Sequence, residues 1–207
     1  MTLMTVLVRT AEYVLITLQN WLWFIPVLVS GFFLSRLVFA FLPLRFRRWW
    51  RIGLTLFLGS ISYMIIWVGD TNLLFTLLVF FPVLFLSSRG DRVGRLAVTM
   101  IFFCLIMPVN AVLDTYYAPA MAHFDLDNVY YYSEKLIRAG NWGLLYLAVR
   151  KHLPEQPPRL APRLWKLVLL LAGMPFSSLL AVVLLPLLQT DYLDSDFLLH
   201  GLIMNLG

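Results

Sequence analysis

Short basic segments separate long apolar runs along this chain, and their order constrains both its class and its topology. Twelve of the 16 Lys and Arg residues lie in three such segments, while nine of the 11 acids lie in the alternate gaps. The basic residues are Arg45, Arg47, Arg48, Arg51, Arg89, Arg92, Arg95, Arg150, Lys151, Arg159, Arg163 and Lys166. Because basic segments stay on the cytoplasmic side during insertion, the alternation predicts a multi-pass protein of the cell membrane with its N-terminus outside.

Composition supports a membrane protein. Hydrophobic residues make up 61% of the chain and charged residues only 13%, against roughly 25% charged in soluble domains. The net charge of +5 is assigned to loops on one membrane face, where anionic lipid attracts them, and not to nucleic-acid binding. The single cysteine, Cys104, rules out an internal disulfide and a Cys-rich metal site. The expected partner is therefore the lipid bilayer, with no cofactor.

The apolar runs predict an all-α polytopic helical bundle. Its transmembrane domain covers residues 21–188 and has six full transmembrane helices, each near the roughly 20 residues that a helix needs to cross. The expected spans are residues 21–42, 52–68, 73–88, 96–113, 130–149 and 164–188.

The two ends of the chain are interpreted differently from the spans. Residues 1–20 carry an apolar stripe at helical spacing, with Arg9 and Glu12 on the other face, which predicts an amphipathic helix resting in the membrane interface. Residues 189–207 are expected to form an outer loop and a partial seventh helix, because the apolar stretch 197–207 is about half the length of a span. We interpret this stretch as the start of a helix that was cut off.

Four short segments occur in order along the chain. They are Arg48-Trp49-Trp50-Arg51-Ile52, Gly69-Asp70-Thr71-Asn72-Leu73-Leu74, Arg95-Leu96-Ala97-Val98 and Asn110-Ala111-Val112-Leu113-Asp114. In this order they are similar to the membrane sensor part of peptide-sensing receptor histidine kinases, the accessory-gene-regulator type of Gram-positive bacteria with a GHKL ATPase domain. The resemblance covers roughly residues 20 to 190.

The resemblance implies a sensor module of a quorum-sensing two-component system. In that family the membrane helices bind an extracellular peptide and transmit the signal to a cytoplasmic kinase, and the receptor is a homodimer. This chain departs from the family after the sixth expected span, where it has no phospho-acceptor His box, Asn-rich ATP box or Gly-rich lid. We therefore expect no kinase activity from the chain itself.

Asn110 and Asp114 are candidate ligand-binding residues. They are four positions apart and so share one helix face, and Pro108 is expected to bend the helix beside them and to couple its two halves. A kink next to polar groups can form a pocket in a membrane helix. The alternative is that the two side chains only join neighbouring helices by hydrogen bonds.

An aromatic group lies in the same outer region. Tyr116, Tyr117, Tyr130 and Tyr131 are candidates to bind a hydrophobic or cationic peptide through their ring faces. The alternative is an ordinary interfacial tyrosine belt. Asn141, between two glycines, is a further candidate contact, or else a mark of close helix packing.

Arg36 lies well inside the first expected span. It either couples neighbouring helices by pairing with an acceptor, or reaches back to the headgroups at the inner interface.

Catalytic and metal-binding patterns do not emerge from the sequence. The three histidines, His123, His152 and His200, lie in separate regions, and none has a second ligand three or four residues away. Cys104 and the pair Ser177–Ser178 have no basic partner at the same depth. The sequence therefore favours a peptide sensor, with a small substrate-binding membrane subunit of a transporter as the alternative and an enzyme as the weakest reading.

Overall fold

The computed structural model describes residues 24–45, 48–67, 71–124, 127–158 and 160–189. Its elements are the first helix Phe24–Phe41, α2 Arg48–Ile61, α3 Asn72–Ser87, α4 Arg92–Val112, the π-helix η1 Leu113–Tyr117, α5 Ala118–His123, α6 Asp127–Val149 and α7 Pro162–Gln189. No strand occurs in these ranges, so the expected all-α class is confirmed there. The expected interfacial helix 1–20 and the partial seventh helix beyond residue 189 lie outside the described residues.

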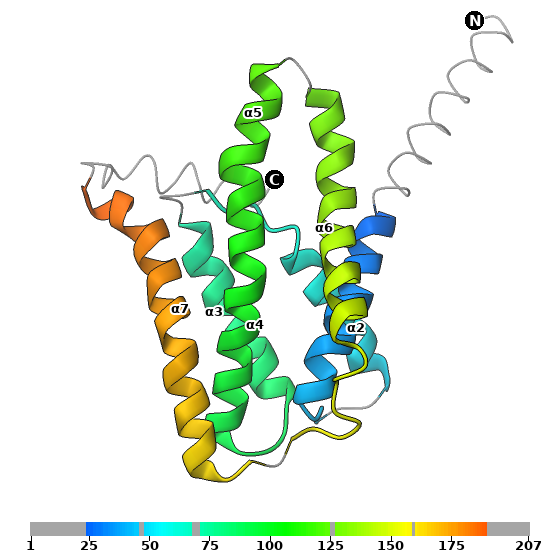
Figure 1. Ribbon diagram of the computed structural model, residues 1–207, viewed down its shortest axis with the longest axis vertical. Helices are drawn as coiled ribbons and strands as arrows, with labels where there is room; N and C mark the ends of the chain where they lie inside the picture. The colour runs from blue at the N-terminus through cyan, green and yellow to red at the C-terminus, as the bar shows by residue number, and fades with distance from the viewer. Residues whose placement is uncertain (1–23, 46–47, 68–70, 125–126, 159, 190–207) are drawn as a thin grey trace, which may run out of the picture.

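The helices run up and down along one common axis (Figure 1). The connections that follow the first helix, α3 and α6 meet at one end, which we call the basic end. Two backbone hydrogen bonds join the first two of these connections there, from Arg45 N to Ser87 O (2.8 Å) and from Arg89 N to Pro43 O (2.7 Å). The opposite end carries a helical hairpin of η1, α5 and α6, which we call the hairpin (Figure 1).

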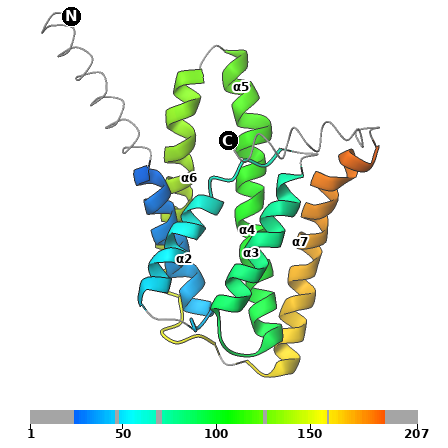
Figure 2. The same cartoon turned by 180° about the vertical axis from the view of Figure 1, so that it is seen from behind.

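Helix α4 forms the centre of the bundle. It buries residues along its whole length, from Gly94 to Ala111, and it contacts both α3 and α7 (Figure 2). Phe103 of α4, Phe81 of α3 and Phe176 of α7 form a triangle of rings whose centroids are 5.6 to 5.7 Å apart. Offset and edge-to-face ring contacts of this kind stabilise helix packing beyond the burial of their area.

Three of the described helices are long and apolar enough to cross a membrane by length and composition: Phe24–Phe41, the continuous helix Arg92–His123 and Pro162–Val182. The helices at the other three expected spans, α2, α3 and α6, do not meet these two criteria together. Helices α2 and α3 have only 14 and 16 residues, shorter than the roughly 20 of a full span. Helix α6 carries Glu134, Lys135 and Arg138.

Helix α2 ends earlier than the expected span 52–68. It stops at Ile61, and residues 62–67, which we call the irregular segment, are not helical. A turn follows the helix, in which Tyr63 N donates to Ser60 O (3.0 Å) and Met64 N to Ile61 O (3.1 Å). This segment contains neither Gly nor Pro, so its shape must be set by contacts from elsewhere in the fold.

The first helix and α2 cross at a pair of glycines. A Cβ atom on Gly59 would lie 2.5 Å from Val27 O, and one on Gly31 would lie 2.3 Å from Thr55 O. Both obstructing atoms belong to the backbone, so no side chain could move aside. Close backbone approach through small residues is a common way for membrane helices to associate.

This crossing predicts opposite effects for two alanine substitutions in α2. Gly59→Ala should lower the free energy of unfolding by about 1–3 kcal/mol, because the added methyl overpacks the crossing. Gly53→Ala is the matched control, since nothing lies within 4 Å of its added Cβ, and it should raise stability by about 0.5–1 kcal/mol through its better helix propensity. Denaturation of the two variants in detergent micelles measures both; equal effects would contradict the close crossing.

Candidate functional site

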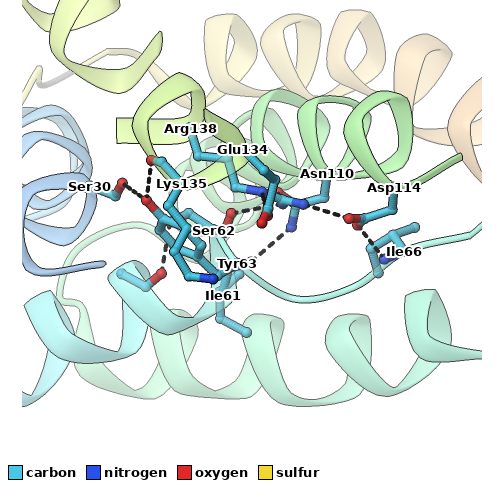
Figure 3. A network of polar contacts seen from close by, with 11 residues as sticks. Ser30, Ile61, Ser62, Tyr63, Ile66, Asn110, Asp114, Glu134, Lys135 and Arg138 are labelled. Atoms are coloured by element: carbon cyan, nitrogen blue, oxygen red, sulfur yellow. Dashed lines mark hydrogen bonds and ion pairs between the residues drawn. The ribbon is translucent and has the colours of Figure 1, made fainter. Parts of the chain in front are cut away.

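The side chain of Arg138, in α6, is completely buried. Its Nε donates to Glu134 Oε1 (2.5 Å) and its Nη2 to Asp114 Oδ1 (2.6 Å). Its Nη1 donates to Asn110 Oδ1 (2.6 Å) and to the backbone carbonyl of Ser62 (3.1 Å) (Figure 3). We call Asn110, Asp114, Glu134 and Arg138 the buried cluster.

Helical spacing places the four side chains. Asn110 and Asp114 are four residues apart at the junction of α4 and η1, and Glu134 and Arg138 are four residues apart on α6. Positions four apart lie on one helix face, and the hairpin brings the two faces together. The hydroxyls of Tyr117 and Ser133, 2.7 Å apart, join the same two helices one turn closer to the connection.

The buried cluster also holds the irregular segment. Asn110 Nδ2 donates to Ile61 O (2.9 Å), and Asp114 Oδ2 accepts from the backbone N–H of Ile66 (2.8 Å). From α3, Asn72 Nδ2 donates to Ile65 O (3.1 Å). Non-helical backbone at membrane depth is tolerated where protein groups bond to it, and these side chains supply such bonds.

Tyr63 ties the first helix to this arrangement. Its hydroxyl donates to the backbone carbonyl of Lys135 (2.8 Å) and lies 3.2 Å from Ser30 Oγ of the first helix. Its ring centroid is 5.7 Å from the guanidinium carbon of Arg138, within the range of a cation–π contact. The first helix, the irregular segment and α6 therefore meet at one point (Figure 3).

The electrostatics of the cluster are those of a buried ion pair. Arg138 lies between two carboxylates, and the side chain of Asp114 is 3% exposed. A buried charge is tolerated when opposite charges and hydrogen bonds surround it. Because Arg138, Asp114 and Asn110 bond to one another and to the backbone of residues 61–66, the arrangement can hold helices together.

The structure brings some of the candidate residues together and separates others. Asn110 and Asp114 are both buried in the cluster, and Pro108 lies inside α4 two residues before Asn110. Tyr117 is bonded within the hairpin, whereas Tyr116 is 66% exposed.

The remaining candidates lie on α6. Tyr130 and Tyr131 lie within this helix, but the structure does not describe their side chains. Asn141 is exposed on this helix, and Gly140 beside it has nothing within 4 Å of an added Cβ. Gly143, on the other side of Asn141, is packed closely, because an added Cβ there would lie 3.2 Å from the ring of Phe33 on the first helix.

Arg36 has a different place from Arg138. It is exposed, and its guanidinium carbon lies 5.2 Å from the ring centroid of Phe32 on the same helix. It forms no ion pair with the described acids, which is the placement of an arginine that reaches toward the headgroups. The arginine that couples helices is Arg138, which the sequence analysis did not single out.

A local signal could have pointed to Arg138. Asp114 lies ten residues before Phe124 and Arg138 eleven residues after Asp127, so the two are nearly equally far from the connection of the hairpin. In two antiparallel helices, such positions lie side by side. A polar pair at i and i+4 on each arm, of complementary charge, therefore predicts an ion pair across the hairpin.

Comparison of the sequence with models of known protein families gives no match, and comparisons with curated proteins and with solved structures give none either.

The cluster predicts a large difference between two arginines of the same chain. Arg138→Met should lower the free energy of unfolding by about 3–5 kcal/mol, because it leaves buried carboxylates without their partner. Arg36→Met, at an exposed position, should change it by no more than about 0.5 kcal/mol. Denaturation in detergent measures both variants.

A double-mutant cycle separates pairing from general disruption. If Asp114 and Arg138 interact directly, the effects of Asp114→Asn and Arg138→Met should differ from additivity by about 0.5–3 kcal/mol. Additive effects, or equal losses for Arg138→Met and Arg36→Met, would contradict the assignment of the pair.

Proposed function

We propose that this chain is a membrane sensor module that recognises an extracellular peptide signal through its hairpin. The signal would pass, by a rearrangement of helices, to a cytoplasmic kinase domain that residues 1–207 do not contain. The observation that carries this proposal is the buried cluster, because one arginine joins the hairpin to the irregular end of α2.

The orientation follows from charge. Two of the basic connections are bonded together at the basic end, and basic segments face the cytoplasm. The hairpin then faces outward, where an extracellular ligand can reach it. The resemblance to peptide-sensing receptor kinases supports the same orientation, and it implies a homodimer.

Recognition would use the exposed surface of the hairpin. Tyr116 and Phe124 are each 66% exposed there, and aromatic faces bind both apolar and cationic groups. The side chain of Glu134, at the edge of the cluster, is 12% exposed, more than those of Asp114 and Arg138. A cationic group of a ligand that reached Glu134 would compete with Arg138 for this carboxylate.

Transmission would depend on how the cluster responds. Arg138 bonds to α4, η1, α6 and the irregular segment, so a shift of the hairpin changes bonds that fix the end of α2. Helix α2 begins at Arg48, at the basic end. A ligand can favour one arrangement only if it binds that arrangement more tightly than the other.

One observation favours the alternative, a substrate-binding subunit of a transporter. Broken helices at membrane depth often form transport sites, with unwound carbonyls that bind the substrate. Here the carbonyls of Ile61 and Ser62 already accept hydrogen bonds from Asn110 and Arg138. Since the protein itself fills the place of a substrate, we prefer the sensor.

Fluorescent labelling tests recognition and transmission together. In a variant with Cys104→Ala, a dye is attached at Ala120→Cys, an exposed position of the hairpin outside the aromatic recognition residues, or at Trp49→Cys, a position 82% exposed at the start of α2. Peptide fractions of spent culture medium from the source cells are added to the chain in liposomes. Both labels should respond, and protease treatment of the fraction should abolish the response.

Two controls make this result specific. A label at Leu170→Cys in α7, 70% exposed, should not respond. Arg138→Met should abolish the response at position 49. No response in any fraction, or an equal response at position 170, would refute peptide sensing by the hairpin.

The partner distinguishes the two candidate functions. A tagged copy of the chain is expressed in the source cells, cross-linked in the membrane and purified, and its partners are identified by mass spectrometry. Recovery of a histidine kinase supports the sensor. Recovery of transporter ATPase subunits in its place supports the alternative.

A further inference from the structure

A cavity of about 340 Å³ lies at the basic end of the bundle. It is formed by the end of the first helix, the start of α4 and the connection from α6 to α7. The lining includes Leu42, Arg89, Arg95, Pro157, Leu160 and Trp165. This cavity is at the opposite end from the hairpin, so it is independent of the proposed sensing site.

Arg95 lines this cavity, and its guanidinium group has no opposite charge beside it among the described residues. Its guanidinium carbon lies 4.1 Å from the ring centroid of Phe85, and its Nη1 donates to Phe85 O (2.8 Å) and Ser88 O (3.2 Å). These contacts fix the plane of the guanidinium group. Its buried Nε has no acceptor among the described residues, and no described carboxylate forms an ion pair with this arginine.

Arg89 supplies a second positive charge. Its Nη2 donates to the backbone carbonyl of Arg45 (2.9 Å), and within the described ranges it too lacks an ion-pair partner. The nearest acid of the lining is Asp91, whose Oδ2 accepts from Gly94 N (3.0 Å) and caps α4. Two arginines and one aspartate leave the lining with a net charge of +1.

Apart from Gln156, the other side chains that line the cavity are apolar. Phe41, Leu42, Leu160 and Trp165 line it, and Trp165 packs so closely on Gly94 that an added Cβ there would lie 2.8 Å from the indole ring. Arginines beside apolar walls at the inner interface suit a molecule with an anionic group and an apolar part. Basic pockets between transmembrane helices on the cytoplasmic side bind anionic lipid headgroups in this way.

We propose that this cavity binds a phosphate group, that of an anionic membrane lipid, through Arg89 and Arg95. The two guanidinium groups donate charge-assisted hydrogen bonds to the phosphate oxygens. The glycerol and the first part of the acyl chains lie against the apolar walls. A lipid held there contacts the first helix, α4 and the connection to α7 at once, and so it joins these elements at the basic end.

Native mass spectrometry of the full chain in neutral detergent tests this site. Phosphatidylglycerol and phosphatidylcholine with the same acyl chains are titrated separately, and the bound fraction of each is measured. Phosphatidylglycerol should bind more tightly, and Arg95→Gln should weaken it about tenfold, the effect of losing one charge-assisted contact. Arg92→Gln is the control, because Arg92 is exposed at the same end and does not line the cavity.

Arg89→Gln keeps the test decisive if Arg95→Gln fails to fold, because Arg89 is exposed. It should also weaken phosphatidylglycerol binding, with an unchanged unfolding midpoint. Equal affinity for the two lipids, or equal losses for Arg89→Gln and Arg92→Gln, would overturn the site.

Inorganic phosphate identifies the source of the phosphate group. If it neither binds nor displaces phosphatidylglycerol, the ligand is the lipid, as proposed. If it binds alone with the same dependence on Arg89 and displaces the lipid, the membrane-lipid assignment is overturned in favour of a soluble phosphate.

Discussion

The buried guanidinium group of Arg138 is the constraint on which the rest of the structure depends. A charge removed from water is stable only with opposite charges and hydrogen bonds around it, and these come from Glu134, Asp114, Asn110 and the Ser62 carbonyl. To supply them, α6 must lie within reach of the junction of α4 and η1, and the end of α2 must approach the same place. One side chain thereby fixes the mutual positions of three segments that are far apart in the sequence.

The short α2 is a consequence of this constraint. A continuous helix over residues 52–68 would bond its own backbone and would leave the Ser62 carbonyl and the Ile66 N–H unable to pair with the cluster. In the fold observed, Asn110, Asp114 and Arg138 take the place of helical hydrogen bonds. The end of α2 is therefore held by side chains from α4, η1 and α6, and the proposed sensor depends on this connection.

The sequence predicts the local features and misses the long-range ones. Hydropathy predicts the all-α class and six membrane spans, of which three are long apolar helices in the described residues. The i, i+4 spacing places Asn110 and Asp114 on one face, because helical spacing is a property of a single helix. The end of α2 at Ile61 could not be predicted, because residues 62–67 after it contain no Gly or Pro. It depends on the contacts of Ser62 with Arg138 and of Ile66 with Asp114, which are 76 and 48 residues apart in the chain. The sequence drew attention to Arg36 because this residue lies well inside an expected span. Arg138 is the arginine that joins the helices, and its partners Ser62 and Asp114 are distant in the sequence.

Hydrogen exchange of the Ile66 amide tests this account most directly. The amide belongs to no helix, and its partner is the Asp114 carboxylate. Protection therefore reports the buried cluster and not secondary structure. The account predicts slow exchange at Ile66 in the native chain and fast exchange in Arg138→Met, with amides inside α7 unchanged. Fast exchange at Ile66 in the native chain, or slow exchange that persists in Arg138→Met, would contradict it.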